Sequence, residues 1–169
     1  MLTDPSFWAH RFPMIRGGGL FIMIMGIAAL LGALTGWRRL FVIAGGVAAT
    51  VAIVLCAAPL SAPFGKPTAL QLYFLFGSIA LEIILIRLAV WRYKRAGDRS
   101  LLLAILFVVG LHFLPMSVAF GPICFILGLV LCAASGIGLW LKPNLSLNLL
   151  WTVDGIIKIA FGAFMYFVF

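Results

Sequence analysis

Residues 101–119 read LLLAILFVVGLHFLPMSVA, a run without a single Asp, Glu, Lys or Arg. A helix needs about 20 mostly apolar residues to cross the hydrocarbon layer of a membrane. The run is therefore predicted to be a membrane-spanning helix. Two residues in it are unexpected in such a setting, the imidazole of His112 and, three positions later, Pro115.

The rest of the chain has the same character. Of its 169 residues, 65% are hydrophobic and only 9% are charged, and the mean hydropathy is +1.25. Water-soluble domains do not have this composition. We predict an all-α integral membrane protein, a bundle of six transmembrane helices with short loops in one domain spanning residues 1–169. The expected helices lie at about 17–36, 40–58, 69–91, 101–119, 121–141 and 148–169.

Two segments outside these spans carry information. Residues 1–16, MLTDPSFWAHRFPMIR, combine aromatic and basic side chains and suit an interfacial segment along the lipid headgroups, although a disordered tail fits as well. Residues 59–68, PLSAPFGKPT, hold three prolines and a glycine. Proline lacks the N–H that a continuing helix needs, so we expect an ordered loop or re-entrant turn there.

Basic residues in short loops predict orientation, because they gather on the cytoplasmic side of membranes. The loops after the first, third and fifth expected helices carry Arg38, Arg39, Arg92, Lys94, Arg95, Arg99 and Lys142. The opposite side carries Arg11, Arg16 and Lys66. We therefore expect both termini outside. The formal net charge of +8 is explained by topology and gives no reason to invoke nucleic acid as a partner.

Ionisable residues inside apolar spans are costly and mark candidate functional sites. Glu82, His112, Asp154 and Lys158 all fall near the expected mid-membrane plane, within about 8 Å of one another in depth. They can meet if the helices at 69–91, 101–119 and 148–169 pack together. Arg87 lies about 140° around the helix from Glu82 and is expected to reach the headgroups instead.

The four residues suggest binding or proton-relay roles. Asp154 and Lys158 are four residues apart and share a helix face, so they can form either a purely structural pair or a functional one. His112 suits proton transfer, yet it can also remain neutral with one hydrogen bond to a carbonyl. Pro115 removes the hydrogen bond to the carbonyl of Leu111 and is expected to kink the helix.

Other chemistry is disfavoured by the pattern of residues. The chain has no paired His or Cys spacing typical of metal sites, and its cysteines, Cys56, Cys124 and Cys132, lie within apolar spans. No nucleophile motif, P-loop or dinucleotide fingerprint occurs, so we expect no metal or cofactor and favour a nonenzymatic role. Glycine and alanine stripes predict close helix packing, with Gly32 and Gly36 as a GxxxG match, and also allow a homo-oligomer.

Two resemblances can be stated. The stretch containing Gly110, His112, Phe113 and Pro115 resembles a GLHFLP-type signature of small bacterial six-helix membrane proteins of uncharacterised function. This resemblance implies a bacterial inner or plasma membrane and no particular activity. In length and helix number the chain is also similar to the substrate-binding subunits of vitamin transporters driven by an energy-coupling module. Ala29 and Ala33 would match their alanine-spaced docking helix, whereas termini outside do not fit that family.

Three functions follow as hypotheses. The first is a proton- or ion-coupled transporter of an unknown small molecule or ion, with Glu82 as the proton or cation site. The second is a noncatalytic membrane subunit or scaffold in which the polar residues only fix helix register. An intramembrane enzyme acting on lipid is the third, disfavoured by the missing nucleophile.

Overall fold

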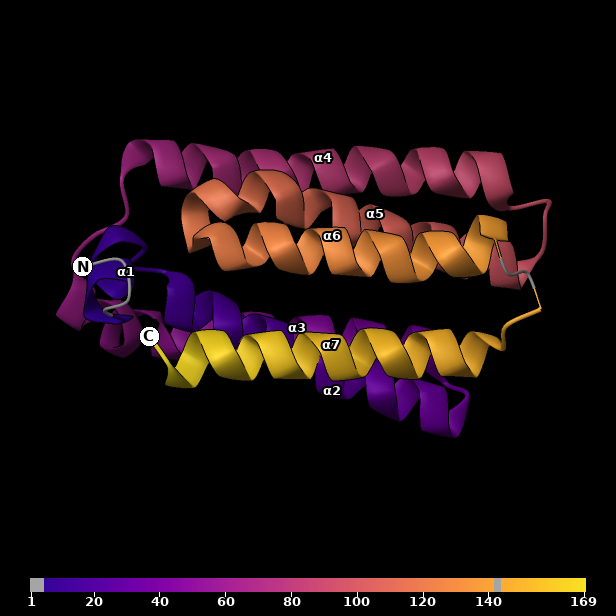
Figure 1. The fold of residues 1–169 in the computed structure, drawn as a ribbon, viewed down its shortest axis with the longest axis horizontal. Helices are drawn as coiled ribbons and strands as arrows, with labels where there is room; N and C mark the ends of the chain where they lie inside the picture. The colour runs from indigo at the N-terminus through magenta and orange to yellow at the C-terminus, as the bar shows by residue number, and fades with distance from the viewer. Residues whose placement is uncertain (1–4, 142–143) are drawn as a thin grey trace.

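The computed structural model describes residues 5–141 and 144–169, apart from the side chains of residues 57–62. Within this part of the chain six helices are long and apolar enough to cross a membrane. They are α2 (Ile15–Thr35), α3 (Arg38–Ser61), α4 (Ala69–Tyr93), α5 (Asp98–Phe120), α6 (Pro122–Gly136) together with the turn η2 (Ile137–Leu141) that continues it, and α7 (Leu147–Phe167) (Figure 1). The prediction of an all-α membrane bundle is confirmed.

Three short elements complete the fold. Helix α1 (Pro5–Arg11) forms from the N-terminal segment, η1 (Ala62–Phe64) is a 3-10 turn after α3, and η2 (Ile137–Leu141) extends α6 as a π-helical turn. The rings of His10 and Phe64 lie 5.7 Å apart, and the guanidinium of Arg16 lies 4.8 Å over Phe64. These contacts fasten α1 and the start of α2 to the connection between α3 and α4.

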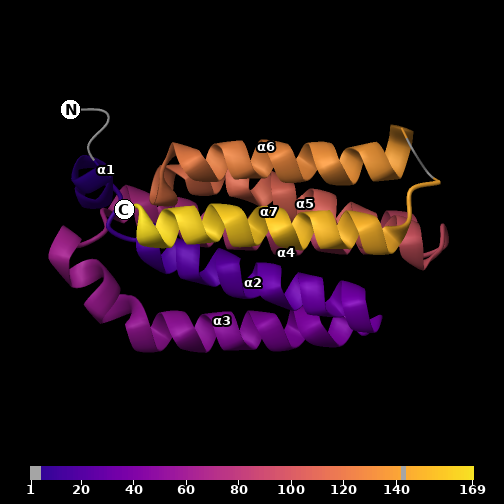
Figure 2. The same ribbon diagram turned by 60° about the horizontal axis from the view of Figure 1, so that its bottom comes forward.

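The helices form two groups. One group contains α2 packed on both α7 and α3, and the other contains α5 packed on both α4 and α6, with a smaller contact between α6 and α7. Figure 2 shows α3 at one edge of the molecule, next to α2. Consequently α3 and α4 are peripheral helices, most of whose side chains face outward.

Glycines set the close packing of α2 against α7, which run in opposite directions (Figure 1). A β-carbon at Gly26 would lie 2.7 Å from the carbonyl oxygen of Gly155, and one at Gly19 would lie 2.7 Å from that of Gly162. The same holds in reverse for Gly155 and Gly162. Only glycine permits the two backbones to approach this closely.

Two expectations about packing and loops were wrong. Gly36 does not pack a neighbouring helix, because it ends α2 with φ +80° and a β-carbon there would meet nothing within 4 Å. Helix α3 runs through Pro59 to Ser61, which shortens the expected loop at 59–68. Proline removes only one helical hydrogen bond, and membrane helices tolerate that loss when the freed carbonyl is satisfied locally.

Turns between helices follow simple chemistry. Gly121 alone separates α5 from α6, at φ +92°, and Pro122 begins α6 without needing the N–H that it lacks. At the start of α4, Thr68 and Gln71 form a capping box in which each side chain accepts a hydrogen bond from the other's backbone N–H. Helix α5 is continuous across Pro115.

Basic residues are divided between the two ends of the bundle. The α2–α3 and α4–α5 connections lie at one end, where Arg39 and Asp98 form an ion pair of 3.1 Å. At the same end the guanidinium of Arg99 donates to the carbonyl oxygens of Gly138 and Leu145, both at 3.0 Å. Helix α1 and the C-terminal end of α7 lie at the opposite end (Figure 1). Lys142, one of the basic residues counted above, falls outside the described residues.

Candidate ionisable centre

Helix α7 positions two of the four candidate residues. Asp154 and Lys158 lie one turn apart, and the Lys158 Nζ donates a hydrogen bond of 2.7 Å to Asp154 Oδ2. Both side chains are 5% exposed. Their mutual contact neutralises two charges that would otherwise be expensive in this environment.

Helices α4 and α5 position the other two. The Nδ1 of His112 lies 3.8 Å from Glu82 Oε1, a separation longer than a hydrogen bond. The His112 side chain is 8% exposed and that of Glu82 is 24% exposed. Within the described residues, Nδ1 is buried without a hydrogen-bond partner.

The two pairs form one electrostatic group. The charge of Lys158 acts on both Glu82 and His112, although α7 packs mainly on α2 rather than on α4 or α5. The structure thus places the four predicted residues in two pairs, Asp154 with Lys158 on α7 and Glu82 beside His112 between α4 and α5. Arg87 is exposed on another side of α4, away from this centre.

Two further buried polar residues lie on the same helices and were not predicted from the sequence. Ser78 is buried one turn before Glu82, and its hydroxyl donates to the Phe74 carbonyl at 2.5 Å. Trp151 is buried one turn before Asp154, and its indole Nε1 has no hydrogen-bond partner among the described residues. Neither residue is charged, so the cost of burying charge does not point to them. Their spacing of one helical turn from Glu82 and from Asp154 is the signal that could have identified them.

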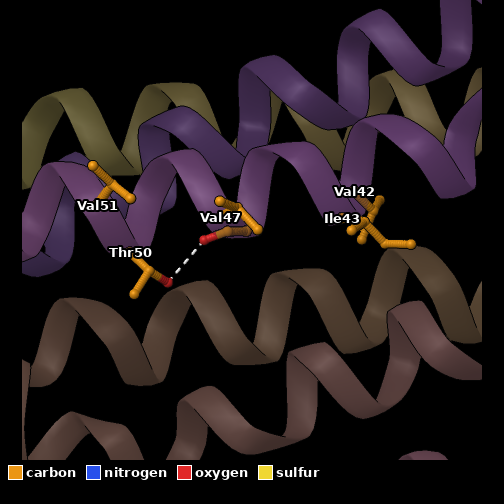
Figure 3. A pocket seen from close by; sticks show the side chains of 6 residues that line it. Val42, Ile43, Val47, Thr50 and Val51 are labelled. Atoms are coloured by element: carbon orange, nitrogen blue, oxygen red, sulfur yellow. Dashed lines mark hydrogen bonds between the residues drawn. The ribbon is translucent and has the colours of Figure 1, made fainter.

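The grooves on the surface lie away from the ionisable centre. A groove of about 410 Å³ lies on α3, lined by Val42, Ile43, Gly46, Val47, Thr50 and Val51. Figure 3 shows Thr50 beside Val47, with the Thr50 hydroxyl bonded to a backbone carbonyl, that of Gly46 at 2.8 Å. A second groove of about 180 Å³ involves Trp8 and Phe169. Neither is lined by the ionisable centre. In the described part of the chain no three His, Cys, Asp or Glu side chains gather as a metal would require.

The two alanines that would match the docking helix of the vitamin-transporter subunits are not on the surface. Ala29 and Ala33 are both buried, in a core cluster with Leu103, Leu106 and Trp151. A docking helix must present its alanines outward, and these alanines instead hold α2 within its own bundle.

The fold and its buried charges define a polytopic helical membrane protein with an ionisable centre. The chain belongs to a family described as "Family of unknown function (DUF6609)", whose model matches residues 8–169. This agrees with the expected membership of an uncharacterised family. No curated protein and no solved structure matches the chain.

Proposed function

We propose that this protein is a proton-coupled membrane carrier in which Glu82 and His112 form the proton site. The observation that supports the proposal is the presence of two ionisable pairs on α4, α5 and α7, Glu82 beside His112 and Asp154 with Lys158, in which the charge of Lys158 acts on the other pair. Buried ionisable residues within membrane helices are rare and mark ion or proton pathways in transporters. Such a centre costs stability, which a purely passive bundle of apolar helices would avoid.

Glu82 and His112 suit the exchange of one proton. A carboxyl group and an imidazole 3.8 Å apart can hold the proton on either side, as acid with neutral ring or as carboxylate with imidazolium. The charge of Lys158 acts on both groups, so a rearrangement of the Asp154–Lys158 pair would change the electrostatic field at the neighbouring site.

The test uses protein reconstituted in vesicles that contain a pH-sensitive dye. Small cations, amines and carboxylates are added one class at a time across an imposed membrane potential. We expect one class to drive proton movement in the wild type, with the response abolished in Glu82→Gln, because glutamine cannot carry the proton. Arg87→Gln is the matched control on the same helix and should keep the response. An unchanged response in Glu82→Gln would rule the proposal out.

A noncatalytic membrane subunit is the second candidate. The observation favouring it is that Asp154 and Lys158 already neutralise each other while fully packed, and that neither groove reaches them. In that role the charged residues select helix register and nothing moves through the bundle. The charge-pair variants in the Discussion distinguish this candidate from a carrier.

We also propose a bacterial inner membrane location with both termini outside. The segregation of basic side chains supports it: the end with Arg39 and Arg99 is rich in them, and the end with α1 carries few. Alkaline phosphatase fused after Phe169 should then be active in bacterial cells, because the enzyme folds only outside the cytoplasm. An inactive fusion, with a cytoplasmic reporter active at the same site, would reverse the orientation.

A further inference from the structure

Glu82 differs from the rest of the ionisable centre in its access to the surroundings. Its side chain is 24% exposed, whereas those of Asp154 and Lys158 are 5% exposed. Helix α4 packs mainly on α5, so its other sides face away from the bundle. The neighbours Leu81, Ile83 and Ile84 are exposed apolar residues on that helix. The surroundings of Glu82 on this flank are therefore hydrocarbon rather than water.

We propose that Glu82 is open to the lipid through the flank of α4 and is the selective site of modification by apolar carbodiimides. This inference rests on the proposed role of Glu82 as the proton site. It adds that the ionisable centre is accessible from the lipid, along α4. The groups facing Glu82 are His112 from α5, and Lys158 with its partner Asp154 from α7. With these groups beside it, 24% of the Glu82 side chain remains exposed.

The chemistry selects a protonated, lipid-accessible carboxyl. The acid adds across one C=N bond of the carbodiimide: its oxygen bonds to the central carbon and its proton passes to a nitrogen. The resulting O-acylisourea rearranges by oxygen-to-nitrogen acyl migration to a stable N-acylurea. Nothing leaves and nothing is oxidised, so the peptide gains the mass of the whole reagent.

The experiment compares two reagents on the full-length protein in vesicles, with adducts located by mass spectrometry. Dicyclohexylcarbodiimide, which partitions into the bilayer, should label Glu82 and leave Asp154 unlabelled. A water-soluble carbodiimide with an added amine should instead convert Asp98, whose side chain is 82% exposed at the bundle end, to an amide with release of the urea, and leave Glu82 unlabelled. The intramembrane adduct should disappear in Glu82→Gln and persist in Asp98→Asn.

Other outcomes would overturn the inference in recognisable ways. Labelling of Asp154 by the apolar reagent would show that the core opens elsewhere. No label at Glu82 while Asp98 reacts normally would show that α4 is covered, for example by a second copy of the chain. The transport test is independent of the labelling test. If Glu82→Gln abolishes proton movement, the proposed function holds even when Glu82 is not labelled.

Discussion

Replacing Asp154 with asparagine is expected to lower the free energy of unfolding by about 3–5 kcal/mol, the usual cost of leaving one member of a buried ion pair without its partner. The ammonium group of Lys158 would lose its 2.7 Å hydrogen bond to a carboxylate while remaining almost fully buried. Denaturation of the purified protein in mild detergent measures the change.

The double variant Asp154→Asn with Lys158→Met should recover most of this loss, because no unpaired charge remains. Asp98→Asn is the control, since it breaks the exposed Arg39–Asp98 pair and should cost at most about 1 kcal/mol. Equal stability of Asp154→Asn and wild type would contradict the buried pair.

The double variant also distinguishes the two candidate functions. In a carrier it folds but loses normal proton movement, whereas in a passive subunit it folds and retains every property of the wild type.

Gly26→Ala is expected to destabilise the bundle by about 1–3 kcal/mol, as overpacking of a tight interface does. The added β-carbon would lie 2.7 Å from the carbonyl oxygen of Gly155 and 2.8 Å from the backbone nitrogen of Ile159. Neither backbone atom can move without separating α2 from α7. The same detergent denaturation measures the loss.

Gly17→Ala is the matched control on the same helix, because a β-carbon there meets nothing within 4 Å. It should be neutral or slightly stabilising, since alanine is the better helix former. If both alanine variants behave alike, the close approach of α2 and α7 is not as described.

Hydropathy alone was sufficient to predict the six membrane helices, because a bilayer requires a long apolar run for each crossing. It could not predict which helices touch. The glycines of α2 that contact α7 are seven residues apart, Gly19 and Gly26, whereas a search for GxxxG favoured Gly32 and Gly36. Seven-residue spacing is typical of helices that cross at shallow angles, and no local pattern specifies the partner.

The candidate site was easier to predict than the packing. Glu82, His112, Asp154 and Lys158 were found because the membrane penalises charge, and their similar depth follows from helical rise alone. The pairing of Asp154 with Lys158 follows from their spacing of four residues. The approach of Glu82 to His112 depends on the rotation of α4 about its axis, which is decided by packing on α5.

Infrared titration of the purified protein shows whether Glu82 and His112 share a proton within the membrane. The carboxylic C=O band absent from Glu82→Gln identifies Glu82. We expect this band to change between about pH 5 and 8, and its midpoint to move in His112→Ala, because coupled groups titrate as a pair. If Glu82 keeps one protonation state throughout, with or without His112, the two residues do not share a proton.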